Sequence, residues 1–198
     1  MNSTVTKALL IGGALLALGA CMKNQAKDAN ATASDANAMS ETAASSDPTA
    51  SAQSAAPSAI SADAAVIQVA ADGTMTELRK GTNGWTCMPD NPQTPGKDPM
   101  CMDANALKWA QAWMAHKPPP ANNVGLMYML QGGSDASNID PFGDKPTNGK
   151  WVDTGPHVMV VGAESLNKLY PATADPDTTK PYVMFGGTPY AHMMIPIK

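Results

Sequence analysis

Residues 103–120 read DANALKWAQAWMAHKPPP, a segment with the pattern of one amphipathic helix. Its apolar residues recur at the spacing of one helix face, namely Ala106, Leu107, Trp109, Ala110, Trp113 and Met114. Asp103 stands where an N-cap side chain accepts hydrogen bonds from the first turn. The prolines at 118–120 must end the helix, because proline lacks an amide donor and clashes with the preceding turn. We therefore expect a helix over residues 104–116 whose apolar face needs a covering layer.

Short apolar segments supply that layer. They are rich in Val, Met and aromatic residues, show little polar alternation, and are bounded by Gly and Pro, which is typical of buried strands. After the helix they are VGLMYMLQ (124–131), HVMVVG (157–162), YVMFGG (182–187) and YAHMMIPI (190–197). A hairpin around Asp72-Gly73 is expected before the helix, and AESLNKLY (163–170) could form a short connecting helix. The pattern predicts an α+β fold, with a small, mainly antiparallel sheet packed on one main helix.

Composition divides the chain into three parts. Residues 1–20 have one basic residue, Lys7, followed by an apolar run that is too short to span a bilayer, as in a secretory signal. Residues 21–61 are mostly Ala, Ser, Thr, Asp and Asn, so they bury too little apolar surface to offset the entropy of ordering, and we expect a flexible tether. Residues 62–198 have the length of one globular domain.

The apolar run ends at Leu18-Gly19-Ala20-Cys21, which resembles the bacterial lipoprotein processing box. Cys21 would then carry acyl chains such as palmitate and anchor the protein to a membrane without spanning it. The alternative is an ordinary cleaved signal in which Cys21 is incidental. Met22-Lys23, with no Asp after the cysteine, resembles sorting signals for the outer membrane. The expected location is the bacterial cell envelope, facing the periplasm or the surface.

The charge balance excludes one class of partner. Without the signal segment, 12 basic residues stand against 17 acidic ones. No basic run or interleaving of basic and aromatic residues occurs, so a nucleic-acid partner is not expected.

Two further cysteines, Cys87 and Cys101, flank a proline-rich loop. Because an exported chain meets an oxidising compartment, the simplest prediction is a disulfide bond between them. Closing a loop of about fifteen residues contributes roughly 3 kcal/mol in the chain-entropy model. A cysteine-based metal or redox role is the alternative, although the CxxC spacing is absent.

Two His-x-Met pairs suggest a soft-metal site. His157 and Met159, and likewise His192 and Met194, would share one face of a strand. Imidazole and thioether ligands suit Cu(I), which is the one cofactor that the residues suggest. The alternative is that both pairs belong to a methionine-packed core. A shared site requires neighbouring strands, a common face and access to solvent.

The remaining candidates lie in loops. Ser134, in a glycine-rich turn, could act as a nucleophile with His157 or His192 as base, although the Gly-x-Ser-x-Gly pattern is absent. Loops 88–100 and 131–156 are long and irregular, which is often a functional feature. The residues proposed for this binding surface are Trp85, Asp135, Asp140, Phe142 and Trp151. The alternative is that these loops only cover the sheet.

Four stretches, GTNGWTCMPDNPQTPGKDPMC, YMLQGGSDASNIDPF, GPHVMVV and GTPYAHMMIPI, resemble an uncharacterised extracytoplasmic bacterial protein family. The resemblance covers most of the domain and implies export, but it implies no catalytic residues. We therefore expect a lipid-anchored envelope protein with a non-enzymatic binding or envelope-associated role. Copper(I) binding is the second hypothesis and serine hydrolysis the third.

Overall fold

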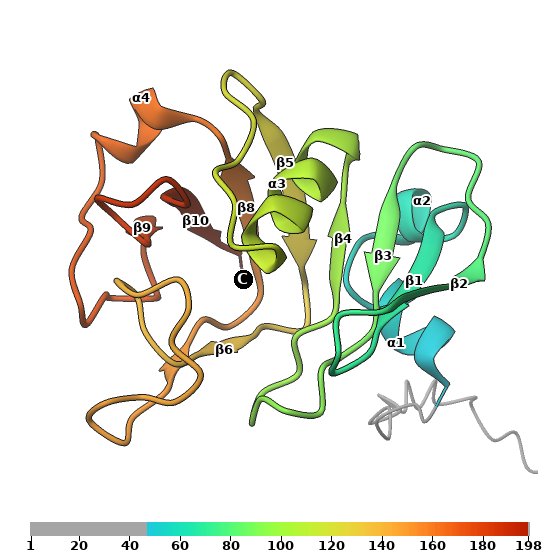
Figure 1. The fold of residues 1–198 in the computed structure, drawn as a ribbon, viewed down its shortest axis with the longest axis horizontal. Helices are drawn as coiled ribbons and strands as arrows, with labels where there is room; N and C mark the ends of the chain where they lie inside the picture. Colours follow the sequence, from blue (N-terminus) through green and yellow to red (C-terminus); the bar gives the residue numbers. More distant parts are fainter. Residues whose placement is uncertain (1–46, 198) are drawn as a thin grey trace, which may run out of the picture. The chain divides into compact units, whose positions relative to one another are not determined.

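The structure, a computed structural model, describes residues 47–197. Its main feature is an eight-stranded sheet in the order β2-β1-β3-β4-β5-β8-β10-β9 (Figure 1). Every neighbouring pair is antiparallel except β1 and β3. The strands are β1 (Ala65–Val69), β2 (Met75–Arg79), β3 (Thr86–Met88), β4 (Met100–Met102), β5 (Gly125–Met129), β8 (His157–Val161), β9 (Tyr182–Met184) and β10 (His192–Pro196). The α+β class and the antiparallel character are confirmed, and the sheet has more strands than the word small suggests.

The main helix is α3 (Ala104–Met114), and its start is fixed as the sequence predicts. One carboxylate oxygen of Asp103 accepts hydrogen bonds from the amides of Asn105 (3.0 Å) and Ala106 (2.7 Å). The other oxygen accepts from the Leu126 amide of β5 at 2.9 Å. Asp103 therefore caps the helix and also fastens it to the sheet.

Each face of the sheet has its own hydrophobic cluster. Partners across neighbouring strands share a face, so Met102, Met127, Met159, Met194 and Tyr182 form one row on the side covered by α3. The opposite face, at β1, β3 and β4, holds Val66, Cys87 and Cys101. Two short helices, α1 (Pro48–Gln53) and α2 (Ser58–Ser61), belong to this second cluster.

These two helices correct the boundary of the expected tether. Residues 47–61 are ordered, and Ala52, Ala55 and Ala56 are buried against the second cluster. The prediction considered only large apolar side chains, whereas small alanines bury well by allowing backbones to approach closely. Residues 21–46 of the expected tether, and the expected signal segment 1–20, lie outside the described residues.

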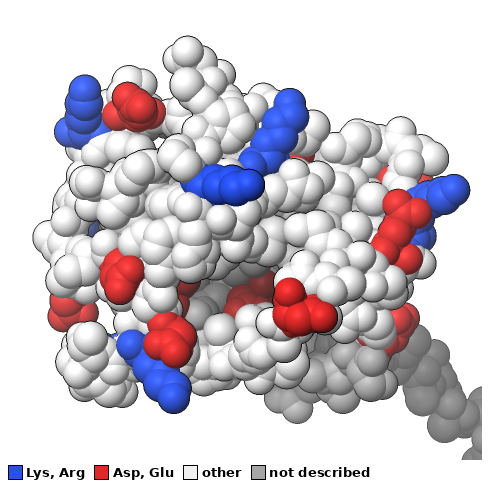
Figure 2. Space-filling model, viewed as in Figure 1, with Lys and Arg blue, Asp and Glu red and all other residues white. Residues whose placement is uncertain are grey.

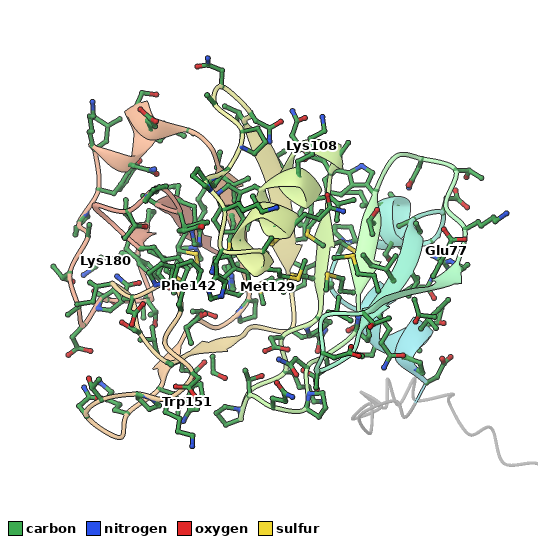
Figure 3. The ribbon with its side chains drawn as sticks, in the orientation of Figure 1. Glu77, Lys108, Met129, Phe142, Trp151 and Lys180 are labelled. Atoms are coloured by element: carbon green, nitrogen blue, oxygen red, sulfur yellow. A yellow bond between two sulfur atoms is a disulfide. The ribbon has the colours of Figure 1, made fainter. Side chains whose placement is uncertain are left out.

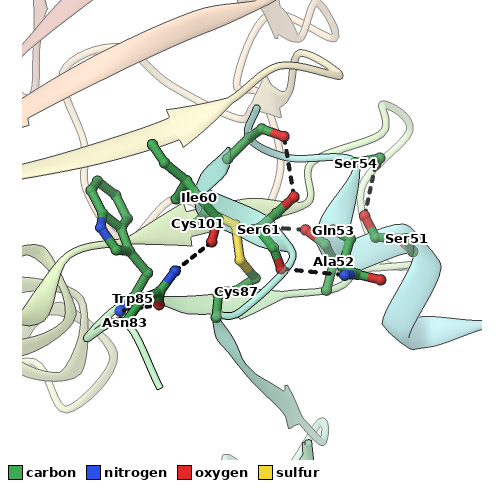
Figure 4. Close-up of a disulfide and its surroundings, with 12 residues drawn as sticks. Ser51, Ala52, Gln53, Ser54, Ile60, Ser61, Asn83, Trp85, Cys87 and Cys101 are labelled. Atoms are coloured by element: carbon green, nitrogen blue, oxygen red, sulfur yellow. Dashed lines mark hydrogen bonds between the residues drawn. A yellow bond between two sulfur atoms is a disulfide. The ribbon is translucent and has the colours of Figure 1, made fainter. Parts of the chain in front are cut away.

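The predicted disulfide bond between Cys87 and Cys101 is present. The two cysteines are directly opposite each other in β3 and β4 and are fully buried. Figure 4 shows the bridge beside Ile60 and Ser61 of the α2 region and near Trp85. The bridge therefore closes the proline-rich loop and supports the packing of the N-terminal helices.

The connection from β5 to β8 carries a second, two-stranded sheet of β6 (Ser134–Asp135) and β7 (Val152–Asp153). The fourth helix, α4 (Glu164–Asn167), follows β8 as expected. These elements hold the loops that form the candidate site.

Candidate functional site

Loops 88–100 and 131–156, which the sequence singles out, meet in the structure. The Gly96 amide donates a hydrogen bond to Ser134 Oγ at 2.9 Å. The amide of Thr154 donates to the Gly133 carbonyl at 3.0 Å. A Cβ atom placed on Gly133 would lie 3.7 Å from Asp98 Cβ and 3.0 Å from Met129 Cε. Gly133 therefore allows the two loops and the end of β5 to approach closely.

This region forms a hollow on the surface. The face drawn in Figure 2 is hollowed at its centre, with acidic side chains at its floor and on its rim. In the same orientation, β6 runs below this part of the molecule and α3 lies above it (Figure 1). Figure 3 places Met129 and Phe142 beside it, whereas Trp151 lies farther down. We refer to the site as the acidic hollow and define it by Asp98 and Asp135, whose charges interact, and by Tyr182, which interacts with Asp135.

Asp98 is held from within its own loop. Its carboxylate accepts hydrogen bonds from the Asn91 amide (2.8 Å) and from the Thr94 hydroxyl, while its amide donates to Asp90 Oδ1 at 2.8 Å. Only 9% of the residue is exposed. Burial raises the pKa of Asp98, and the charge of Asp90 adds to this, against the lowering by the hydrogen bonds from Thr94 and Asn91.

Asp135, in β6, lies close enough to Asp98 for their charges to interact. Protein atoms surround the Asp135 side chain closely, but part of the residue is still exposed to solvent, as expected at the floor of a hollow. Burial, followed by the repulsion from Asp98, raises its pKa to about 7. No lysine, arginine or histidine of residues 47–197 offsets this effect. The site thus holds two carboxyl groups without a compensating cation, which is an arrangement typical of functional sites.

Two buried polar atoms, on β9 and β8, have no hydrogen-bond partners within residues 47–197, and the first of them, in Tyr182, interacts with Asp135. The Tyr182 hydroxyl is buried and has no hydrogen-bond partner within residues 47–197. Burial raises its pKa, and the charge of Asp135 adds to the increase. His157 is the cross-strand partner of Met129. Its Nδ1 donates to the Gly155 carbonyl at 2.7 Å, so its unpartnered Nε2 is left as an acceptor.

The His-x-Met pairs meet two of their three conditions. Strands β8 and β10 are neighbours, and Met159 and Met194 are directly opposite each other on a common face. However, His192 is opposite Val161 and His157 is opposite Pro196, so the histidines lie four positions apart, about 13 Å along the strands at 3.3 Å per residue.

Access is the condition that the pairs do not meet. Both histidines and both methionines are buried. Burial lowers the pKa of His192 to about 4 despite the hydrogen bond from its Nδ1 to the Tyr190 carbonyl, and the charge of His157 adds to the lowering. The arrangement favours the alternative reading, a methionine-packed core, over a single copper site.

The serine hydrolase hypothesis requires a hydrogen-bonded pair of nucleophile and base, which Ser134 and the two histidines do not form. Ser134 Oγ accepts the Gly96 amide and is buried, while Nε2 of both His157 and His192 has no hydrogen-bond partner within the described chain. A serine nucleophile needs a base within hydrogen-bond reach, and neither histidine takes that position here.

Only one of the five proposed loop residues, Asp135, belongs to the acidic hollow. Trp85 packs on Tyr128, with ring centroids 5.7 Å apart, in the second cluster. Asp140 is exposed and accepts the Phe142 amide in a turn. Phe142 stacks on His116 with centroids 4.0 Å apart, and Trp151 is half-buried beside β7.

Sequence reasoning missed Asp98 and Tyr182. One feature of the sequence pointed to Asp98, namely its position in the proline-rich loop that was already a candidate binding segment.

Comparisons of this chain with protein-family models, with curated proteins and with solved structures give no match. The acidic hollow must therefore be interpreted from its own chemistry.

Proposed function

We propose that this protein is a non-enzymatic binding protein of the bacterial envelope that takes a small cationic ligand in the acidic hollow. The observation that supports this is the pair Asp98 and Asp135, two carboxyl groups brought together from different loops with no cation of residues 47–197 beside them. Buried or partly buried charges are normally paired. A bound ammonium or guanidinium group would supply the missing partner.

The hydrogen-bonding groups of the hollow favour the same ligand class. The carboxylates of Asp98 and Asp135 accept hydrogen bonds. The only unpartnered donor among the defining residues is the Tyr182 hydroxyl. A ligand rich in N–H donors matches such an acceptor-rich site. When the cation binds, Asp135 loses its proton, because a neighbouring positive charge favours the carboxylate.

The first prediction tests ligand charge with three probes of similar shape, namely benzylamine, benzyl alcohol and benzoate. Benzylamine should bind and shift the NMR signals of residues around Asp135, while the neutral and anionic probes should not. Asp135→Asn keeps the shape but removes the charge, so affinity for benzylamine should fall about tenfold or more, as for loss of a charge-assisted hydrogen bond. Affinity should also rise from pH 6 to pH 8 as Asp135 ionises.

Asp153→Asn is the matched control, because Asp153 is exposed in the neighbouring strand β7. It removes the same charge outside the hollow and should leave the affinity within about twofold. Equal binding of benzyl alcohol and benzylamine, or unchanged benzylamine affinity in Asp135→Asn, would contradict the proposal.

We also propose that a lipid on Cys21 anchors the protein to the membrane, with the outer membrane favoured by Met22-Lys23. Cys21 lies outside the described residues. Within residues 47–197 no helix has the length and apolar character needed to cross a bilayer. Cys87 and Cys101 are joined to each other, which leaves Cys21 as the cysteine available for acylation.

The second prediction concerns this anchor. Cells grown with radioactive palmitate should label the wild-type protein and the control Met22→Leu, but not Cys21→Ser. Cys21→Ser should also leave the membrane fraction, since several acyl chains contribute about 0.8 kcal/mol per buried methylene. Equal label in Cys21→Ser and the wild type would exclude the anchor.

A further inference from the structure

A second cavity lies beside α4 and the connection between β9 and β10, well away from β6, which carries Asp135 (Figure 1). Its volume is about 400 Å³, within the range of roughly 300 to 1,000 Å³ that small-molecule sites occupy. Its walls come mainly from residues 119–122, from α4 and from residues 186–189. None of the residues that define the acidic hollow lines this cavity, so the two sites are separate.

Most of the cavity wall is small and apolar. The lining residues include three prolines and three alanines. Gly186 belongs to the same wall, and a Cβ atom placed on it would lie 2.5 Å from Ala172 Cβ, so a larger residue does not fit there. The wall therefore suits the apolar body of a small ligand.

Two opposite charges stand side by side at this cavity. Among its lining residues within 47–197, only Glu164 and Lys168 are charged. Both are exposed, and neither side chain forms an ion pair or hydrogen bond within the described chain. They are four positions apart on α4, and Lys168 keeps helical backbone angles, so their Cβ atoms are about 5 to 6 Å apart. One small ligand can therefore reach both side chains.

The backbone is strained on two sides of the cavity. Asn122, which lines it, has a φ of +55°, and Phe185, directly before the glycine wall, has a φ of +57°. A bulky residue rarely adopts this left-handed conformation. Hydrogen bonds hold Phe185 in it, because its amide donates to the Asn138 carbonyl at 2.7 Å and its carbonyl accepts from the Thr188 amide at 3.1 Å. Strained residues of this kind cluster at ligand-binding and catalytic sites.

We infer that this cavity is a second ligand site, for a zwitterionic α-amino acid with a small aliphatic side chain. The ammonium group pairs with Glu164 and the carboxylate with Lys168, since both ligand charges are attached to one carbon atom that the two side chains flank. The aliphatic side chain lies against the prolines and alanines of the wall and leaves water. A ligand with a single charge would leave one of the two residues unpaired, whereas a zwitterion matches both.

Three probes of similar shape test the two charges separately, namely L-leucine, L-leucinamide without the carboxylate, and N-acetyl-L-leucine without the ammonium group. The readout is an NMR titration that follows the backbone amide signals of Gly186 and Gly187, which line the cavity. Leucine should shift both signals in a saturable manner with a Kd on the order of 1 mM, as expected for so small a ligand. It should bind more tightly than either of the other probes.

Two substitutions of exposed residues assign the partners. Glu164→Gln should weaken binding of leucine and leucinamide about two- to tenfold and leave N-acetyl-leucine unaffected. Lys168→Gln should weaken leucine and N-acetyl-leucine and leave leucinamide unaffected. Glu77→Gln and Lys145→Gln are the matched controls, because both residues are exposed and lie outside the cavity. They make the same changes of charge and should leave all three affinities unchanged.

Four outcomes would overturn the inference. The first is no saturable shift of the two glycine signals up to about 50 mM leucine. The second is equal affinity for the three probes, and the third is a leucine affinity that neither Glu164→Gln nor Lys168→Gln changes. The fourth is loss of the leucine shifts in Asp135→Asn, which would assign them to the acidic hollow. Failure of benzylamine to bind in the acidic hollow would leave these results untouched, so the two sites are tested separately.

Discussion

Asp135→Asn is expected to stabilise the folded protein at pH 8. The ordinary pKa of an aspartate is near 3.8, and in the folded protein burial and Asp98 raise that of Asp135 to about 7. Between these values the unfolded chain has lost the proton that the folded chain keeps. Stability therefore falls as the pH rises from about 4 to 7, and the full cost persists above pH 7. Removing the charge should recover on the order of 2 to 4 kcal/mol, the lower figure reflecting the partial exposure of Asp135.

Urea unfolding of the wild type, Asp135→Asn and the control Asp153→Asn at pH 5 and pH 8 measures this effect. The gain in the free energy of unfolding for Asp135→Asn should be large at pH 8 and roughly a third of that at pH 5, because the cost builds up between about pH 4 and pH 7. It should be absent at both for Asp153→Asn. The low pKa of His192 destabilises the fold below about pH 6.5, but it does so in all three proteins and cancels in the difference. A loss of stability in Asp135→Asn at pH 8 would contradict the prediction.

The same substitution should therefore raise stability and weaken benzylamine binding about tenfold or more. A purely structural aspartate would behave differently, because its replacement would remove favourable hydrogen bonds and lower stability. A residue that costs the fold free energy while its loss removes binding fits the trade-off between stability and function. A rise in the free energy of unfolding together with a fall in benzylamine affinity distinguishes a residue that serves binding from one that serves packing.

The sequence was most informative where one local rule decides the structure. Asp103 and the prolines 118–120 bound α3 because capping and the missing proline amide act within a few residues. Asp72-Gly73 marked the β1–β2 hairpin for the same reason. Helix α1 was not predicted, because Ala52 and Ala55 stabilise the fold only by packing on the disulfide region. That contact joins residues far apart in the chain, and composition does not reveal it.

The candidate site was predicted in part for a related reason. The loops and Asp135 stood out by length and composition. Asp135 lies near Asp98 and Tyr182 because the sheet places three separate segments side by side. No local pattern in a single sequence predicts that placement. The His-x-Met pairs show the converse. Their strands are adjacent, but the register that aligns Met159 with Met194 places His157 and His192 on either side of that pair, four positions apart along the strands. Register follows from the whole sheet and not from the tripeptides.

Removing the disulfide bond should have the second large effect. Cys87→Ala combined with Cys101→Ala should lower the free energy of unfolding by about 3 kcal/mol, because the bridge closes a loop of about fifteen residues. The cost should concentrate around α1 and α2, whose alanines pack beside the buried bridge. Hydrogen exchange should report faster opening of residues 48–61 than of α3, and urea unfolding should report the overall loss.

The acidic hollow should weaken as well, because the bridge closes the loop that carries Asp98. In the double variant the loop is held by the pairing of β3 with β4 and by hydrogen bonds such as that from Gly96 to Ser134, and benzylamine affinity should fall several-fold even where the domain remains folded. Adding reductant should reproduce both losses in the wild type and change nothing in the double variant. If the double variant kept full affinity while losing stability, Asp98 would be positioned by its own loop hydrogen bonds alone. In that case the bridge would serve the N-terminal packing and not the binding site.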